Sequence, residues 1–196
     1  MQKVYFVRHA QPNYRNFNDR MRELTEKGLQ DRLLVTSYLE DKNIGAVYSS
    51  PYKRAIDTVK DFADTHHMEV HTLEGFRERA IHEAWIADVD FTAFVKNQWS
   101  DFSYKLPDGG ESLQEDQDRN IDALYTMLRQ CPGKNLAVGS HGTALSTIIR
   151  YFDPSFGYED FQAIKGRMPW IVEFQFDESL YCVGIRYDKT KLFKED

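Results

Sequence analysis

Three short apolar runs occur along the chain, and each is followed at once by polar or charged residues. They cover residues 4–7, 46–48 and 136–138. Continuous apolar runs of this length are typical of strands that are buried on both faces of a parallel sheet. Two later stretches, WIVEFQF and LYCVGIRY, are separated by Asp-Glu-Ser and predict an antiparallel hairpin at the edge of the sheet.

Segments with helical spacing of apolar residues lie between these runs. We expect helices to begin near Thr25, near Pro51, at a Ser112–Glu115 capping box and after His141. The positions expected to face the core are Leu29, Leu33, Thr36 and Leu39 in the first helix, Ile56, Val59 and Phe62 in the second, Leu113, Ile121, Leu124, Tyr125 and Leu128 in the third, and Leu145, Ile148 and Ile149 in the fourth.

Alternating strands and helices predict a three-layer α/β/α fold, with a mostly parallel sheet and helices on both faces. The 196 residues suit one domain, 1–196. Residues 79–110 interrupt the alternation, because Phe91, Phe94, Val95 and Trp99 stand close to helical spacing and LPDGG follows them. We interpret this stretch as a small helical cap over one end of the sheet.

The polar residues that follow the apolar runs include Arg8, His9, Arg54 and His141. Ligands of open α/β sheets bind at the carboxyl ends of the strands, so these four side chains are expected to share one pocket. Arginine offers a planar fork for phosphate oxygens, and neutral histidine is a nucleophile near physiological pH. The pattern therefore indicates phosphoryl chemistry.

Composition and charge narrow the class of protein. Net charge is −6 and the pI is about 5.5, whereas nucleic-acid and anionic-membrane binding usually require a basic surplus. No apolar run approaches the ~20 residues of a membrane span, and the N-terminus lacks a signal-peptide pattern. Cys131 and Cys182 lie far apart without metal-ligand spacing, so we expect reduced thiols in a cytoplasmic protein.

Four motifs in order, RHAQ, SSPYKRAIDT, FRER and SHG, resemble those of the histidine phosphatase superfamily, the phosphoglycerate-mutase-like proteins. The resemblance extends from residue 4 to about residue 149 and includes LTEKG and GGES. It implies that His9 attacks phosphorus to form a phosphohistidine. It also implies that Arg8, Arg54 and an imidazolium at His141 hold the equatorial oxygens, without a metal or other cofactor.

The resemblance also assigns an acid–base role. Glu78 in FRER would protonate the leaving oxygen and then accept a proton from water, although Glu74 and Glu83 stand near it. Gln11, Asn13 and Gly142 would join the substrate-binding residues. Ala10 stands where the family more often has glycine. We interpret EDQD, residues 115–118, as a solvated helix face.

These implications favour a phosphomonoester hydrolase that acts on a small-molecule phosphate monoester, with no nucleic-acid or membrane partner. A phosphoglycerate mutase must hold a second anionic group, and the only cations from residue 79 to 110 are Arg79, Lys96 and Lys105. A non-catalytic module that binds a phosphorylated ligand is the remaining alternative. The sequence leaves the physiological substrate open, and it leaves a homodimer open.

Overall fold

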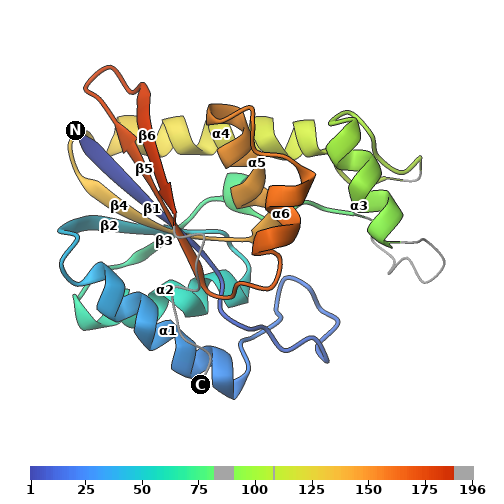
Figure 1. The fold of residues 1–196 in the computed structure, drawn as a ribbon. Helices are drawn as coiled ribbons and strands as arrows, with labels where there is room; N and C mark the ends of the chain where they lie inside the picture. Colours follow the sequence, from blue (N-terminus) through green and yellow to red (C-terminus); the bar gives the residue numbers. More distant parts are fainter. Residues whose placement is uncertain (82–90, 108, 188–196) are drawn as a thin grey trace.

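Six strands form one mixed sheet in the part of the chain that the computed structural model describes, residues 1–81, 91–107 and 109–187 (Figure 1). Their order across the sheet is β3-β2-β4-β1-β5-β6. The first four strands in this order are parallel to one another. β5 is antiparallel to both of its neighbours, β1 and β6. The strands are β1 (Gln2–Arg8), β2 (Ile44–Ser49), β3 (Val70–Thr72), β4 (Asn135–Ser140), β5 (Trp170–Phe176) and β6 (Cys182–Tyr187).

Helices cover both faces of this sheet, as the sequence predicts (Figure 1). Those on one face are α1 (Glu26–Leu39) and α2 (Lys53–Thr65), and those on the other are α4 (Leu113–Gln130), α5 (Gly142–Phe152) and α6 (Tyr158–Ile164). The short 3₁₀ helix η1 (Glu74–Phe76) follows β3, and α3 (Phe91–Ser100) lies in the predicted insertion. The sequence patterns did not predict β3 or α6.

Two hydrophobic clusters, one on each face, fill the space between the sheet and the helices. Burial of apolar surface contributes roughly 25 cal/mol per Å², so these clusters are the main source of stability. The cluster under α1 and α2 contains Tyr5, Val7, Val35, Leu39, Val47, Val59, Phe62 and Ile171 among its buried members. The cluster under α4, α5 and α6 contains Val4, Phe6, Leu124, Leu128, Leu145, Ile148, Phe161 and Phe174 among its buried members.

Both predicted helix caps are present. The Thr25 hydroxyl accepts the Gly28 N–H (3.0 Å), and Ser112 exchanges hydrogen bonds with Glu115 in a capping box (3.1 and 2.9 Å). These side chains satisfy N–H groups that have no partner within the helix, which fixes where α1 and α4 begin.

The predicted core face of α1 is wrong in part. Leu29 and Leu33 are 38% and 46% exposed, while Gly28, Val35 and Leu39 are buried. Gly28 can face inward because it has no β-carbon. A β-carbon at this position would lie 2.3 Å from the Gln11 carbonyl oxygen. In α2 the expected start is also shifted, since Tyr52 is the N-cap and Pro51 precedes it.

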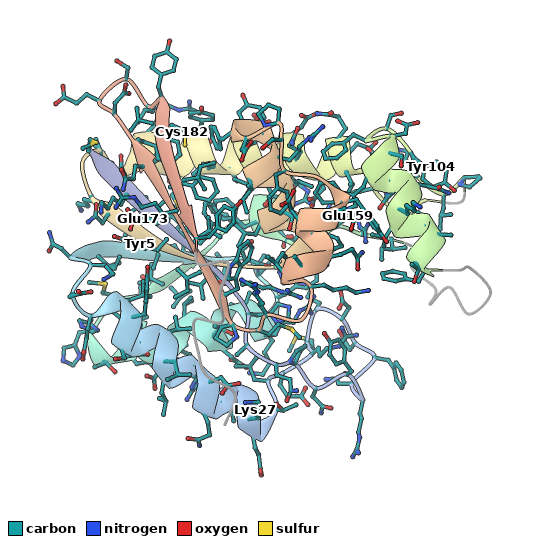
Figure 2. The ribbon with its side chains drawn as sticks, in the orientation of Figure 1. Tyr5, Lys27, Tyr104, Glu159, Glu173 and Cys182 are labelled. Atoms are coloured by element: carbon teal, nitrogen blue, oxygen red, sulfur yellow. The ribbon has the colours of Figure 1, made fainter. Side chains whose placement is uncertain are left out.

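The insertion contains the predicted helix, α3, which packs against α6. The ring centroids of Trp99 and Phe161 lie 5.4 Å apart, and Gln98 donates to the Glu111 carbonyl (3.0 Å). The ring of Tyr104, which is labelled in Figure 2, packs against that of Phe94 with 5.9 Å between the ring centroids. Residues 82–90 of the expected cap lie outside the described residues, and a single domain with a lid over the sheet stays a prediction.

Candidate active site

The carboxyl ends of β1 and β4 bring two histidines together. Arg8 lies opposite Ser140 in these parallel strands, and the His9 N–H donates to the Ser140 carbonyl (3.0 Å). The imidazole rings of His9 and His141 have centroids 5.4 Å apart, and both residues are buried. The two histidines that the sequence places at strand ends are therefore neighbours.

His9 is held in one tautomer. Its Nδ1 lies 2.8 Å from the Ala10 carbonyl oxygen, which can only accept, so Nδ1 carries the proton and Nε2 keeps its lone pair. The Ala10 N–H donates to Thr58 of α2 (3.0 Å), which fixes this turn. Burial, followed by the charges of Arg54 and Arg8, lowers the pKa of His9 well below its usual value. His9 is thus a neutral imidazole with a free Nε2.

Two arginines supply the positive charge beside this ring. Arg8 ends β1, is buried, and donates through Nη1 to the Ile164 carbonyl (2.9 Å). Its Nε has no hydrogen-bond partner within the described ranges. Arg54 is in the first turn of α2, 3.1 Å from a carboxylate oxygen of Asp19, and lies over the Tyr52 ring at 4.9 Å. Arginine stays protonated in such surroundings, so the site is cationic.

His141 is the N-cap of α5 and approaches Tyr52 edge-on, with 5.2 Å between ring centroids. Its Nε2 lies 2.7 Å from the Ser50 hydroxyl, and its buried Nδ1 has no hydrogen-bond partner in the part of the chain that the structure describes. Burial, followed by the Arg54 charge, lowers the pKa of His141 well below its usual value. These surroundings favour a neutral imidazole; the imidazolium that the resemblance implies beside a phosphoryl group stays a prediction.

Glu78 follows η1 and turns its carboxylate toward the N-terminus of α5. It accepts N–H bonds from Thr143 and Ala144 (both 3.2 Å) and from Arg79 (2.9 Å). Oriented N–H groups at a helix N-terminus stabilise a negative charge. The carboxylate also interacts electrostatically with Arg8, which places it beside the cationic part of the site.

The neighbouring carboxylates differ from Glu78 in their surroundings. Glu74 is 61% exposed and pairs with the exposed side chain of Arg20. Glu83 lies outside the described residues. Of the two candidate acids within the described residues, Glu78 is the one held against α5.

A partly buried ionic network holds the backbone on both sides of Glu78. Arg119 of α4 donates to the Arg77 carbonyl (3.1 Å), and Glu111 accepts the Ala80 N–H (2.9 Å). Glu111 also accepts hydrogen bonds from Arg77 (2.5 and 2.6 Å) and Arg119 (3.1 Å). Burial raises the pKa of Glu111, but these donors outweigh it and lower that pKa to about 2.

Asp116 completes this network from inside α4. It is fully buried and accepts hydrogen bonds from Arg119 (2.7 Å) and from Thr147 of α5 (2.9 Å). Burial, followed by the negative charge of Glu78, raises the pKa of Asp116 to about 7. The solvated face predicted for EDQD is therefore wrong at Asp116 and at Gln117, which is also buried. Asp116 stands one residue after the capping Glu115, and nothing in that spacing indicates its burial.

Three residues that the sequence assigns to substrate binding have other contacts. Gln11 accepts from the Thr25 hydroxyl (2.8 Å), and Asn13 donates to Glu23 (2.6 Å). Both side chains therefore fasten the loop before α1, and their role toward a substrate stays a prediction. Gly142 leaves room for Arg8, since a β-carbon at Gly142 would lie 3.1 Å from the Arg8 Cζ and Nε.

The described residues contain no group of three or more His, Cys, Asp or Glu side chains placed to hold a metal ion. None of the helices in the same ranges is both long and apolar enough to cross a membrane. Cys131 and Cys182 are free thiols, each partly buried.

The fold and the site define an α/β protein with two neutral histidines, two arginines and a helix-bound glutamate at one edge of a sheet. The model of the histidine phosphatase superfamily (branch 1) matches residues 4–181. The chain therefore belongs to the histidine phosphatase superfamily, as the resemblance of its four motifs implies.

Individual relatives agree with this membership. A metal-independent phosphoserine phosphatase from Arabidopsis thaliana is 29% identical over 162 residues, which cover 74% of this chain and 66% of that protein, just under two thirds of its length. Among solved structures, a phosphoserine phosphatase variant from Entamoeba histolytica in complex with phosphoserine has a TM-score of 0.73 at 21% identity, covering 94% of this chain and 96% of the other. A mycobacterial glucosyl-3-phosphoglycerate phosphatase with inorganic phosphate has a TM-score of 0.75 at 17% identity, covering 98% and 99%.

Proposed function

We propose that this chain is a phosphomonoester hydrolase that acts on a small phosphorylated metabolite through a phosphohistidine at His9. The observation that carries the proposal is the tautomer of His9, whose Nδ1 donates to the Ala10 carbonyl at 2.8 Å and leaves the Nε2 lone pair free. A neutral imidazole flanked by Arg8 and Arg54 combines a nucleophile with two cations for a phosphoryl group.

In the first step, Nε2 of His9 attacks phosphorus, an N–P bond forms, and the bond from phosphorus to the leaving oxygen breaks. Glu78, protonated at this stage, gives its proton to that oxygen, so that an alcohol departs. Arg8, Arg54 and His141 oppose the charge that is spread over the equatorial oxygens.

In the second step, water attacks the phosphohistidine, and Glu78, now a carboxylate, accepts a proton from the water. The N–P bond breaks and its electron pair returns to Nε2, which releases inorganic phosphate and regenerates His9. The three N–H bonds that Glu78 receives from Thr143, Ala144 and Arg79 hold the carboxylate in one place for both transfers.

Hydrolysis is favoured over mutase-type transfer by what the cations of the insertion contact. Arg79 is buried, donates to Gln98 and lies over the Phe94 ring at 5.5 Å, and Lys105 pairs with Glu115 (2.6 Å). Two of the three cations from the insertion are thus engaged, and a second anionic group on a bisphosphorylated intermediate would need such cations. Water is accordingly the proposed acceptor.

The relatives support a small phosphorylated metabolite as the substrate class. The Entamoeba phosphatase has been solved with phosphoserine and with 3-phosphoglyceric acid, and the mycobacterial one with phosphate. The Arabidopsis relative is described as metal-independent. We accordingly propose that this chain needs no metal, and that its activity survives EDTA.

The test is to trap the intermediate. Purified protein is mixed with a ³²P-labelled aryl phosphate, quenched rapidly and denatured, and the label is tested for stability in acid and in base. We expect acid-labile, base-stable label on the wild type and none on His9→Ala, which should have no turnover. The exposed His71 gives a matched control, since His71→Ala should keep both label and activity.

Label recovered on a serine or an aspartate would contradict the proposal. A label that forms but passes to 3-phosphoglycerate faster than to water would identify a mutase. Tight phosphate binding without any label or turnover would identify a non-catalytic module.

A further inference from the structure

Ser50 is a fully buried residue that directly follows β2, with its hydroxyl beside the Nε2 edge of the His141 ring. Its hydroxyl oxygen accepts the Tyr52 backbone N–H (3.2 Å) and lies 2.7 Å from His141 Nε2.

The Ser50 hydroxyl proton has one available acceptor. A buried hydroxyl that cannot donate is an unsatisfied polar group, which destabilises the folded state. The Tyr52 N–H is a donor, and the only acceptor that this hydroxyl contacts among the described residues is His141 Nε2. The hydroxyl is therefore satisfied only if Nε2 is unprotonated.

We propose that Ser50 is a positioning residue that donates its hydroxyl proton to His141 Nε2 and so keeps the His141 proton on Nδ1, the nitrogen that meets a phosphoryl oxygen. The inference rests on the proposed function, because it assigns a phosphoryl group as the acceptor for Nδ1–H. The buried Nδ1 has no hydrogen-bond partner within the described chain, so its proton is available.

The neutral state of His141 makes this choice of tautomer matter. Burial and the Arg54 charge lower the pKa of His141, so the ring carries one proton and can donate from one nitrogen only. A bare Nδ1 would present a lone pair to an anion and repel it. One hydroxyl behind the ring thus decides whether His141 attracts or repels the phosphoryl group.

His9 and His141 then use the same tautomer in opposite senses. In His9 the Nδ1–H donates to the Ala10 carbonyl, and the unprotonated Nε2 is the nucleophile. In His141 the bare Nε2 faces Ser50 and the Nδ1–H is the donor. The difference lies in the partner that each ring has behind it, a carbonyl in one case and a hydroxyl in the other.

The test reads the tautomer directly. Protein labelled with ¹⁵N in its histidine rings is examined by long-range ¹H–¹⁵N NMR at pH 7.5, where bare and protonated ring nitrogens resonate far apart. The His141 signals are assigned by their loss in His141→Gln. We expect Nδ1–H with a bare Nε2 in the wild type and a mixture of tautomers in Ser50→Ala.

Kinetics supply the second measurement. Ser50→Ala should lower kcat/KM for an aryl phosphate about tenfold, less than the ~10²–10³-fold loss that follows removal of a whole oxyanion donor. Ser49→Ala is the matched control, because Ser49 is an adjacent, fully buried serine whose hydroxyl has no hydrogen-bond partner among the described residues. That control should keep the wild-type tautomer and activity.

Three results would overturn the proposal: a wild-type His141 with its proton on Nε2, a Ser50→Ala protein that keeps Nδ1–H alone, or a Ser50→Ala protein that shows the mixture but loses no activity. The wild-type spectrum decides the first even if Ser50→Ala fails to fold. Failure of the proposed function would look different, since the wild type would then form no phosphohistidine while its His141 tautomer remained as assigned.

Discussion

Gly142→Ala should damage the site by moving one guanidinium. The added β-carbon would lie 3.1 Å from Arg8 Cζ and Nε and 3.2 Å from Nη2, where ordinary contacts begin at about 3.4 Å. Arg8 is buried and is held through Nη1 by the Ile164 carbonyl (2.9 Å), so it cannot swing aside freely. The guanidinium must therefore shift by a few tenths of an ångström.

The size of the effect follows from this displacement. A 1 Å misplacement of a catalytic group can cost ~10²-fold, so a few tenths of an ångström should lower kcat/KM by roughly three- to tenfold, or about 1 kcal/mol. Inorganic phosphate should bind more weakly by a similar factor, because Arg8 is expected to contact the phosphoryl oxygens in both complexes.

The assay compares Gly142→Ala with Gly166→Ala, at which an added β-carbon has no neighbour within 4 Å. We expect the control to keep its kcat/KM for p-nitrophenyl phosphate and its inhibition by phosphate. Urea unfolding should show that both variants stay within about 1 kcal/mol of the wild type. If Gly142→Ala keeps both its activity and its phosphate affinity, then Arg8 either tolerates the displacement or does not contact the phosphoryl group, and the reasoning is refuted.

Two further predictions concern stability. The pKa of His141 is lowered in the folded protein, so the unfolded chain binds a proton more readily and stability falls as pH drops below ~6.5. From pH 7.5 to 5.0 this residue should cost at most about 2 kcal/mol, the limit for a ring that stays neutral in the folded protein. Urea unfolding at both pH values should show a smaller loss in His141→Gln than in the wild type, and an equal loss in both proteins would contradict the prediction. Gly28→Ala should destabilise by ~1–3 kcal/mol, since its β-carbon would lie 2.3 Å from the Gln11 carbonyl oxygen; unfolding midpoints equal to those of Gly166→Ala would exclude that clash.

The sequence was sufficient to locate the histidines and arginines because their placement depends on topology. Arg8 ends β1, His9 follows it and His141 follows β4. The carboxyl ends of adjacent parallel strands necessarily meet at one edge of the sheet. The β1, β2 and β4 strands were likewise predictable, since uninterrupted apolar runs have few alternatives in a buried sheet.

The features that the sequence did not predict depend on close approach or on a side chain's far end. The buried face of α1 is decided by Gly28 against the Gln11 backbone, and a glycine adds nothing to a hydrophobic pattern. We expected Asp116 to be solvated because acidic residues usually are. The hydrogen bonds that Thr147 and Arg119 donate to its carboxylate offset the cost of its burial, and neither residue is of a type usually found in a core. The neutral state of His141 follows from burial beside Arg54, which no spacing reveals.

The hydrogen bonds of Arg119 restrict which amino-acid substitutions this chain tolerates, both in mutagenesis and in evolution. Its one guanidinium contacts the carbonyls of Gly75 and Arg77 and the carboxylates of Glu111 and Asp116. Asp116 is fully buried, whereas Glu111 and Arg119 are partly buried. Removing one partner of a fully buried ion pair typically costs 3–5 kcal/mol, so losses approaching that size would take a large part of the 5–15 kcal/mol that keeps a domain folded. Libraries that randomise Glu111, Asp116 or Arg119 singly should return almost nothing but the original residue, whereas joint randomisation can recover apolar sets of matching volume. In aligned relatives, these positions should therefore change together.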